Sequence, residues 1–295
     1  MNFYEHITAN KRKTYFLISC FALLVLFLGY VFGLYLGNSF LGLFISLSVG
    51  FFYGFVMYFS GAQMILTLSH AFPAAKKEYP HYINTVEGLA LAAGIPPPQA
   101  YIIEDSAINA FATGISPGKA AITVTTGALK RLNRTELEGV LAHEMSHIKN
   151  YDIRVMLVVV VFIGIIALLS DMLLRTMIYG RGGQREEKGV GLLVLAGFAL
   201  ALFSPLIAEL MRLAVSRKRE FLADASGTQL TRYPEGLSSA LKKIRDDKEP
   251  LVEAANKATA HLFIENPLRV FGGKTNALFS THPDINERIK RLEEM

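Results

Sequence analysis

Five consecutive residues, His143-Glu144-Met145-Ser146-His147, combine two imidazoles and a carboxylate at a spacing that suits a metal site. In a helix, residues four apart differ by only about 40° in direction, so both imidazoles project from one face. They can then bind one Zn²⁺ ion, which lowers the pKa of a water molecule to near neutrality. Glu144 points beside them, where its carboxylate can take the proton of that water. The pattern H-E-x-x-H therefore predicts a hydrolytic zinc centre.

The neighbours of this motif favour a buried site over two histidines on a surface helix. Apolar residues precede and follow it, namely Leu137, Val140, Leu141 and Ile148. Burying two imidazoles and a carboxylate on a helix destabilises the fold unless these groups have hydrogen-bonding or metal partners. A bound metal ion supplies such a partner.

A catalytic zinc site needs a third protein ligand and leaves the fourth position to water. Glu220 and Asp224 lie one helical turn apart, and Phe221, Leu222 and Ala223 between them favour a partly buried helix. This pair suits a ligand and a carboxylate that orients a ligating imidazole. An ordinary charged helix with contacts between residues four apart has the same spacing, so spacing alone leaves both interpretations open.

Together with the apolar blocks on either side, these motifs resemble those of the HtpX-like membrane zinc metalloproteases, which are relatives of the type I CAAX prenyl proteases. The resemblance covers nearly the whole chain and includes residues 109–114, 141–152, 216–224 and 280–283. It implies that Glu220 is the third zinc ligand and that Asp224 supports the site from behind a ligand. It also implies a gluzincin-type metalloendopeptidase with a single zinc ion per chain.

The resemblance assigns a further role to His282 and Arg288, which are expected to hold substrate and to stabilise the developing oxyanion. From the residues alone a plainer interpretation is favoured. In that interpretation His282-Pro283 begins a helix and Arg288 is a surface charge.

A substrate-binding edge is expected at Asn109, Ala110 and Phe111. With a strand expected at 120–125, the segment 109–114 suggests an edge to which an extended peptide adds as a further strand. The alternative is a plain loop before an interior strand. The remaining elements expected here are a helix at 82–93, a strand at 100–103 and a long helix at 134–150.

Long apolar blocks place part of the chain in a membrane. Residues 14–36 and 39–60 each exceed the ~20 residues that a helix needs to cross a bilayer, and only a turn at 37–38 separates them. The first block is too long for a removable signal peptide and no small-residue cleavage site follows it. Basic residues at 11–13 precede it, so the positive-inside rule places the N-terminus and the chain after residue 60 in the cytoplasm.

Composition excludes two other kinds of site. The single cysteine, Cys20, permits neither an intrachain disulfide nor a cysteine-based zinc site. The net charge of +5 arises from basic residues that cluster beside the apolar blocks, and no base-reading motif accompanies it. We therefore expect no nucleic-acid partner.

Two further apolar blocks, at 155–174 and 190–208, are expected to be transmembrane helices. If both cross the bilayer, the basic loop at 175–189 lies outside, against the positive-inside tendency. The alternative is that one or both blocks lie within the protein or dip into the membrane without crossing it.

We therefore expect a mainly α-helical membrane protein in which a zincin-like domain with a small β-sheet accompanies two to four transmembrane helices. Its expected parts are a transmembrane hairpin (1–60), the first part of the zincin domain (61–154), the second apolar pair (155–212) and the second part of the zincin domain (213–295). The expected location is the cell (inner or plasma) membrane, as a multi-pass protein whose site faces the cytoplasm. The resemblance implies misfolded or damaged membrane proteins as substrates.

Three other functions fit the residues less well. A processing enzyme for prenylated peptides is expected to have more spans, enclosing a chamber. A scaffold with structural zinc normally fills all four positions with protein ligands and would leave Glu144 without a role. A metal transporter would need its His-Glu pair inside the apolar spans.

Overall fold

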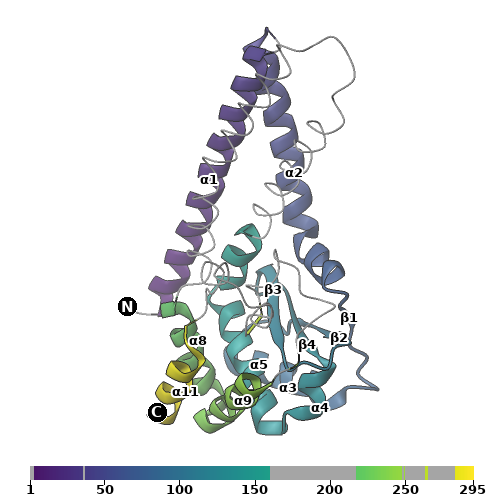
Figure 1. Ribbon diagram of the computed structural model, residues 1–295, viewed down its shortest axis with the longest axis vertical. Helices are drawn as coiled ribbons and strands as arrows, with labels where there is room; N and C mark the ends of the chain where they lie inside the picture. Colours follow the sequence, from purple (N-terminus) through teal and green to yellow (C-terminus); the bar gives the residue numbers. More distant parts are fainter. Residues whose placement is uncertain (1–2, 36, 160–216, 248, 250–262, 265–282) are drawn as a thin grey trace.

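The computed structural model describes residues 3–35, 37–159, 217–247, 249, 263–264 and 283–295. Two long helices form a hairpin that projects from a domain (Figure 1). In this domain a central helix packs against a sheet and against a group of shorter helices. Residues 160–216, which hold most of the second apolar pair, lie outside the described residues.

The predicted helical hairpin is formed by α1 (Phe3–Tyr35) and α2 (Ser39–Leu68). The side chain of Asn38 begins α2 by accepting a hydrogen bond from the backbone N–H of Leu41 at 3.1 Å. The two helices are in close contact near this turn because glycine faces glycine. A Cβ atom at Gly42 would lie 2.2 Å from the carbonyl oxygen of Gly29. From the turn, the helices diverge toward the domain (Figure 1).

The outer surface of α2 is strongly apolar. Among the described residues, one stretch, Ser39–Val56, is long and apolar enough to cross a membrane. Phe40, Phe44 and Phe51 are largely exposed on this helix. A contiguous apolar surface of this kind normally marks a contact with lipid or with another protein.

The small β-sheet has four strands in the order β1-β2-β4-β3. Its strands are β1 (Phe72–Pro73), β2 (Gln99–Ile103), β3 (Ala110–Ser116) and β4 (Lys119–Thr125). The central pair, β2 and β4, is parallel, and both outer strands are antiparallel to their neighbours. The strands predicted at 100–103 and 120–125 are confirmed as β2 and β4, whereas two-residue β1 has no sequence signal of its own.

Helix α5 (Arg134–Lys149) lies at the centre of the domain, against β3 on one side and against α8 and α9 on the other. Its apolar residues are almost fully buried, among them Val140, Leu141 and Met145. The other helices are α3 (Pro80–Ala93), α4 (Thr126–Arg131), α8 (Arg217–Thr231), α9 (Pro234–Asp246) and α11 (Ile285–Glu293). The helices predicted at 82–93 and 134–150 are therefore confirmed, with ends that differ by at most two residues.

Glu136 fixes the start of α5 and ties it to α9. Its carboxylate accepts hydrogen bonds from the backbone N–H of Asn133, from the hydroxyl of Ser239 and from the ammonium of Lys243, each at 2.7 Å. Burial by itself raises the pKa of Glu136, but these donors outweigh it, and the pKa of Glu136 is lowered overall. The carboxylate form therefore stabilises the fold.

This depressed pKa predicts a loss of stability in acid. Because the folded pKa of Glu136 lies below its unfolded value of about 4.3, its contribution is complete above that pH and disappears as the pH falls through the folded pKa. The melting temperature of Glu136→Gln should thus fall below that of the wild type at pH 7, and the gap should narrow toward pH 3. Glu138→Gln, two residues further along α5, is the matched control. An equal gap at both pH values would contradict the assignment.

Candidate metal centre

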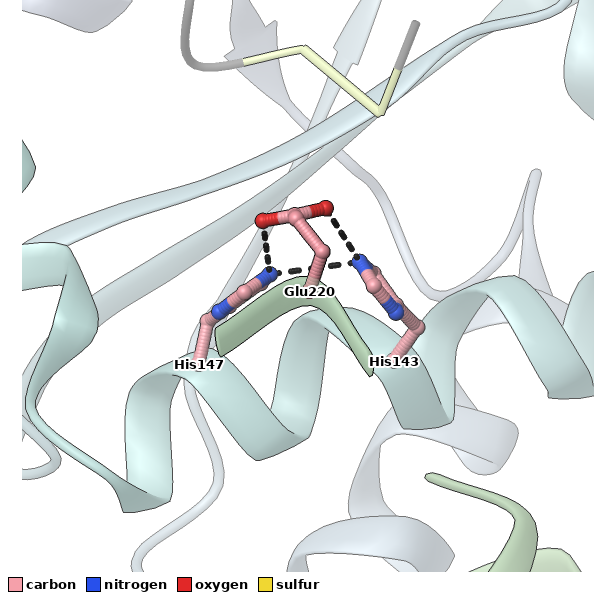
Figure 2. Close-up of side chains that lie close together, drawn as sticks. All are labelled: His143, His147 and Glu220. Carbon is pink, nitrogen blue, oxygen red and sulfur yellow. Dashed lines mark hydrogen bonds and ion pairs between the residues drawn. The ribbon is translucent and has the colours of Figure 1, made fainter. Parts of the chain in front are cut away.

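Three buried side chains from two helices converge on one point (Figure 2). His143 and His147 project from adjacent turns of α5, and the carboxylate of Glu220 on α8 faces both of their Nε2 atoms. The two Nε2 atoms are 3.2 Å apart. The oxygens of Glu220 lie 3.7 Å from the Nε2 of His143 and 3.5 Å from that of His147.

Close packing of α8 on α5 brings Glu220 to the two histidines. The buried residues of α8 include Glu220, Ala223, Asp224 and Gly227, which recur at helical spacing along one face. A Cβ atom at Gly227 would lie only 3.0 Å from the backbone nitrogen of His143. Glycine at this position therefore lets the two helix backbones approach each other where the three side chains meet.

The separations of these atoms fit a tetrahedral zinc ion. Zinc lies about 2.0–2.2 Å from nitrogen and oxygen ligands, so tetrahedral ligand atoms are roughly 3.3–3.6 Å apart. The observed 3.2, 3.5 and 3.7 Å bracket that range. Burial lowers the pKa of His147, but the surrounding carboxylates outweigh it and raise this pKa to about 9. The same negative potential that favours a proton here favours a metal cation.

The rear nitrogen of each imidazole is held by a carboxylate. The Nδ1 of His143 is 2.9 Å from Asp224, and the Nδ1 of His147 is 3.0 Å from Asp152. An Nδ1–H that donates to a carboxylate leaves the Nε2 lone pair free to face a metal ion, and it fixes the ring orientation. Both rings thus have the orientation that a metal ligand requires.

Arg288 on α11 is buried behind this site. Its guanidinium donates two hydrogen bonds to Asp224, at 2.9 and 2.7 Å, and another of its nitrogens lies 3.7 Å from Glu220. Burial by itself raises the pKa of Asp224, but Arg288 and His143 outweigh it and lower this pKa to about 2. Asp224 therefore stays ionised, as an acceptor from His143 must be.

Glu144 is also buried, next to His143 on α5. Burial raises its pKa, and the charge of Glu220 adds to this effect. The two imidazoles and Arg288 oppose both, yet the net shift is upward. A raised pKa makes the Glu144 carboxylate a better proton acceptor than an ordinary glutamate.

The comparison with known proteins identifies the family. The model of peptidase family M48 matches residues 76–295 of the chain. The chain belongs to peptidase family M48. It is 44% identical over 293 residues to a protease HtpX homolog from Dictyoglomus turgidum, covering 99% of this chain and 95% of that relative. A protease HtpX homolog from Listeria monocytogenes serotype 4a is 41% identical over 304 residues and is covered to 99%.

Membership of family M48 makes this chain a protease, and it confirms the resemblance drawn from the motifs. Among solved structures, Ste24p from S. mikatae is similar with a TM-score of 0.47 and 19% identity, over 82% of this chain and 58% of that one. Within the described part of this M48 protease, the buried His143, His147 and Glu220 form a group that can bind a metal ion.

Asp152 is a site residue that the motifs of this M48 protease do not reveal. In an unbroken helix, a residue five positions after His147 points about 140° away from it. Here α5 ends, and Tyr151 adopts a left-handed conformation with φ of 61°. That turn redirects the chain, so Asp152 reaches back to His147. Asp152 is the last residue of the matched segment 141–152, but the resemblance assigned it no role.

The residues predicted to bind substrate lie at the start of β3 and are all buried. Ala110 pairs with Val124 of β4, and its carbonyl oxygen accepts a hydrogen bond from the backbone N–H of Ile264 at 3.0 Å. The ring of Phe111 packs against Phe263, with centroids 5.0 Å apart. Residues 263–264 therefore cover β3 at this point. The substrate role of Asn109, Ala110 and Phe111 stays a prediction, and His282 lies outside the described residues.

Proposed function

We propose that this chain is a membrane-anchored zinc endopeptidase that hydrolyses peptide bonds in misfolded or damaged membrane proteins. The observation that carries the chemistry is the convergence of His143, His147 and Glu220 with Glu144 beside them. Among the described residues this cluster offers three ligand atoms, which suits an open catalytic site better than a closed structural one. The substrate class rests on the family resemblance.

In this proposal a bound zinc ion supplies a Lewis acid that polarises the scissile carbonyl and acidifies water. Glu144 takes a proton from the attacking water and returns it to the leaving amine. Asp224 and Asp152 hold the two imidazoles in place. Arg288 keeps Asp224 ionised, and with His282 it is proposed to stabilise charge on the oxyanion.

The proposed location is the cell membrane, with the site on the cytoplasmic side. Two features support it: the apolar stretch Ser39–Val56 of α2, and the basic residues at 11–13 that precede the apolar part of α1. The lipid bilayer is thus a proposed partner of the hairpin, and the second apolar pair is proposed to add two more spans.

Metal removal tests the proposal. The purified protein in detergent should contain about one zinc ion per chain, as expected for a site with three protein ligands. Dialysis against a chelator should abolish casein digestion, and added Zn²⁺ should restore it. Proteolysis that survives complete removal of the metal would contradict the proposal.

A further inference from the structure

A residue of the hairpin makes direct contact with the carboxylate behind His147. Asn10 lies on α1 and is only 4% exposed. Its side-chain Nδ2 donates one hydrogen bond to the carbonyl oxygen of Asn150 at 2.9 Å and another to Oδ1 of Asp152 at 2.8 Å. Both N–H groups of the amide are therefore used on the turn that follows α5.

The two carboxylate oxygens of Asp152 have different partners. Oδ2 faces the Nδ1 of His147 at 3.0 Å, and Oδ1 accepts from Asn10. Arg219 also faces Oδ1, but at 3.7 Å, beyond the usual range of a hydrogen bond. Among these partners, Asn10 is the one that contacts Oδ1 at hydrogen-bond distance. With one oxygen held by Asn10 and the other facing His147, the plane of the carboxylate is fixed relative to the ring.

The neighbours of Asn10 reinforce this attachment of α1. The ammonium of Lys11 lies 4.7 Å from the centre of the Tyr151 ring, and the guanidinium of Arg154 lies 4.8 Å from it. Tyr151 is the residue whose left-handed conformation directs Asp152 toward His147. Such a conformation is unfavourable for a residue other than glycine and persists only where its surroundings hold it. Lys11 of α1 is part of those surroundings.

We propose that Asn10 is a positioning residue of the metal centre, so that hairpin helix α1 forms part of the site. Asn10 orients Asp152, Asp152 orients the imidazole of His147, and the Nε2 of His147 faces the metal position. The inference rests on the proposed function, because it assumes that zinc binds there. It goes further in making the hairpin a component of the centre as well as an anchor.

Zinc affinity of the full chain in detergent tests the proposal, measured by competition with a chromogenic chelator. Replacing a residue that hydrogen-bonds to a metal ligand typically lowers metal affinity by about 10–100-fold. Asp152→Asn should therefore weaken zinc binding by about that amount. Asn10→Leu has a branched side chain of similar shape but removes both donors, and it should weaken binding by about tenfold. Asn10→Ala should act in the same direction without added bulk. The absorption spectrum of bound Co²⁺ should change in all three variants.

Thr14→Val is the matched control. Thr14 lies one turn along α1 and is equally buried, but its hydroxyl donates to the backbone carbonyl of Asn10, within the same helix. This variant should keep the zinc affinity and cobalt spectrum of the wild type. The double variant Asn10→Leu/Asp152→Asn should bind zinc no more weakly than Asp152→Asn alone, because residues that act through each other are not additive.

Wild-type zinc affinity and cobalt spectra in folded Asn10→Leu and Asn10→Ala would overturn the inference and leave the proposed function standing. Losses that add in the double variant would also overturn it, since Asn10 would then act independently of Asp152. Failure of the wild type to bind zinc would instead remove the proposed function, and this inference with it.

Discussion

Replacing Glu144 by glutamine is expected to abolish peptide hydrolysis while leaving zinc content and fold in place. Glutamine has nearly the shape of glutamate but cannot take a proton from water. Because general acid–base catalysis contributes about 10²–10⁴-fold, kcat should fall by at least about 10²-fold. Glu144 is buried and its pKa is raised, so a neutral side chain at this position should not destabilise the fold.

Casein digestion together with metal analysis of the same preparation provides the measurement. Glu138→Gln, on the same helix, is the control and should digest casein at the wild-type rate. A Glu144→Gln protein that has lost its zinc would mean that Glu144 is a ligand. One that retains full activity would remove Glu144 from the reaction, or would reveal a contaminating protease.

The second large effect concerns Glu220, whose replacement by alanine should remove most of the zinc. Glu220 faces the Nε2 atoms of both histidines, so its loss leaves two protein ligands where an open site needs three. Asp224→Asn should weaken binding less, by about 10–100-fold, because it acts from behind His143. Measuring the zinc content per chain and the zinc affinity by chelator competition distinguishes the large loss in Glu220→Ala from the smaller one in Asp224→Asn.

A change in Asp224 also affects Arg288, which is left with a poorer partner in a buried position. Removing one partner of a buried pair costs about 3–5 kcal/mol, so Asp224→Asn should also melt earlier. Glu235→Gln, at an exposed position of α9, should change neither property. Wild-type zinc affinity in Glu220→Ala would exclude Glu220 from the centre.

The parts of the site that sequence could predict are those that depend on local periodicity. His143 and His147 share a helix face because four residues make about one turn, and their apolar neighbours predicted that the helix is buried. Spacing alone did not decide whether Glu220 is a ligand, since an ordinary charged helix has the same pattern. The family resemblance indicated Glu220, and in the structure its carboxylate lies against both histidines.

The remaining contacts depend on tertiary structure. Asp152 reaches His147 only because Tyr151 adopts φ of 61°, which is uncommon for a residue other than glycine. Asn10 meets Asp152 across 142 positions of sequence, and nothing near Asn10 indicates that contact. Arg288 was assigned to the oxyanion, and its salt bridge with Asp224 depends on how α11 packs against α8, which no local pattern encodes.

The order of these residues along the chain has a consequence for biosynthesis. His143 and Arg288 are in contact although 145 positions separate them. At synthesis rates of about 5–20 residues per second, α11 follows α5 out of the ribosome by roughly 7–30 s. During that interval the histidines exist without the arginine that keeps Asp224 ionised. A chain under synthesis therefore has His143, His147 and Glu220 in place before Arg288, and the contacts of Arg288 with Asp224 and His143 form only once α11 has docked.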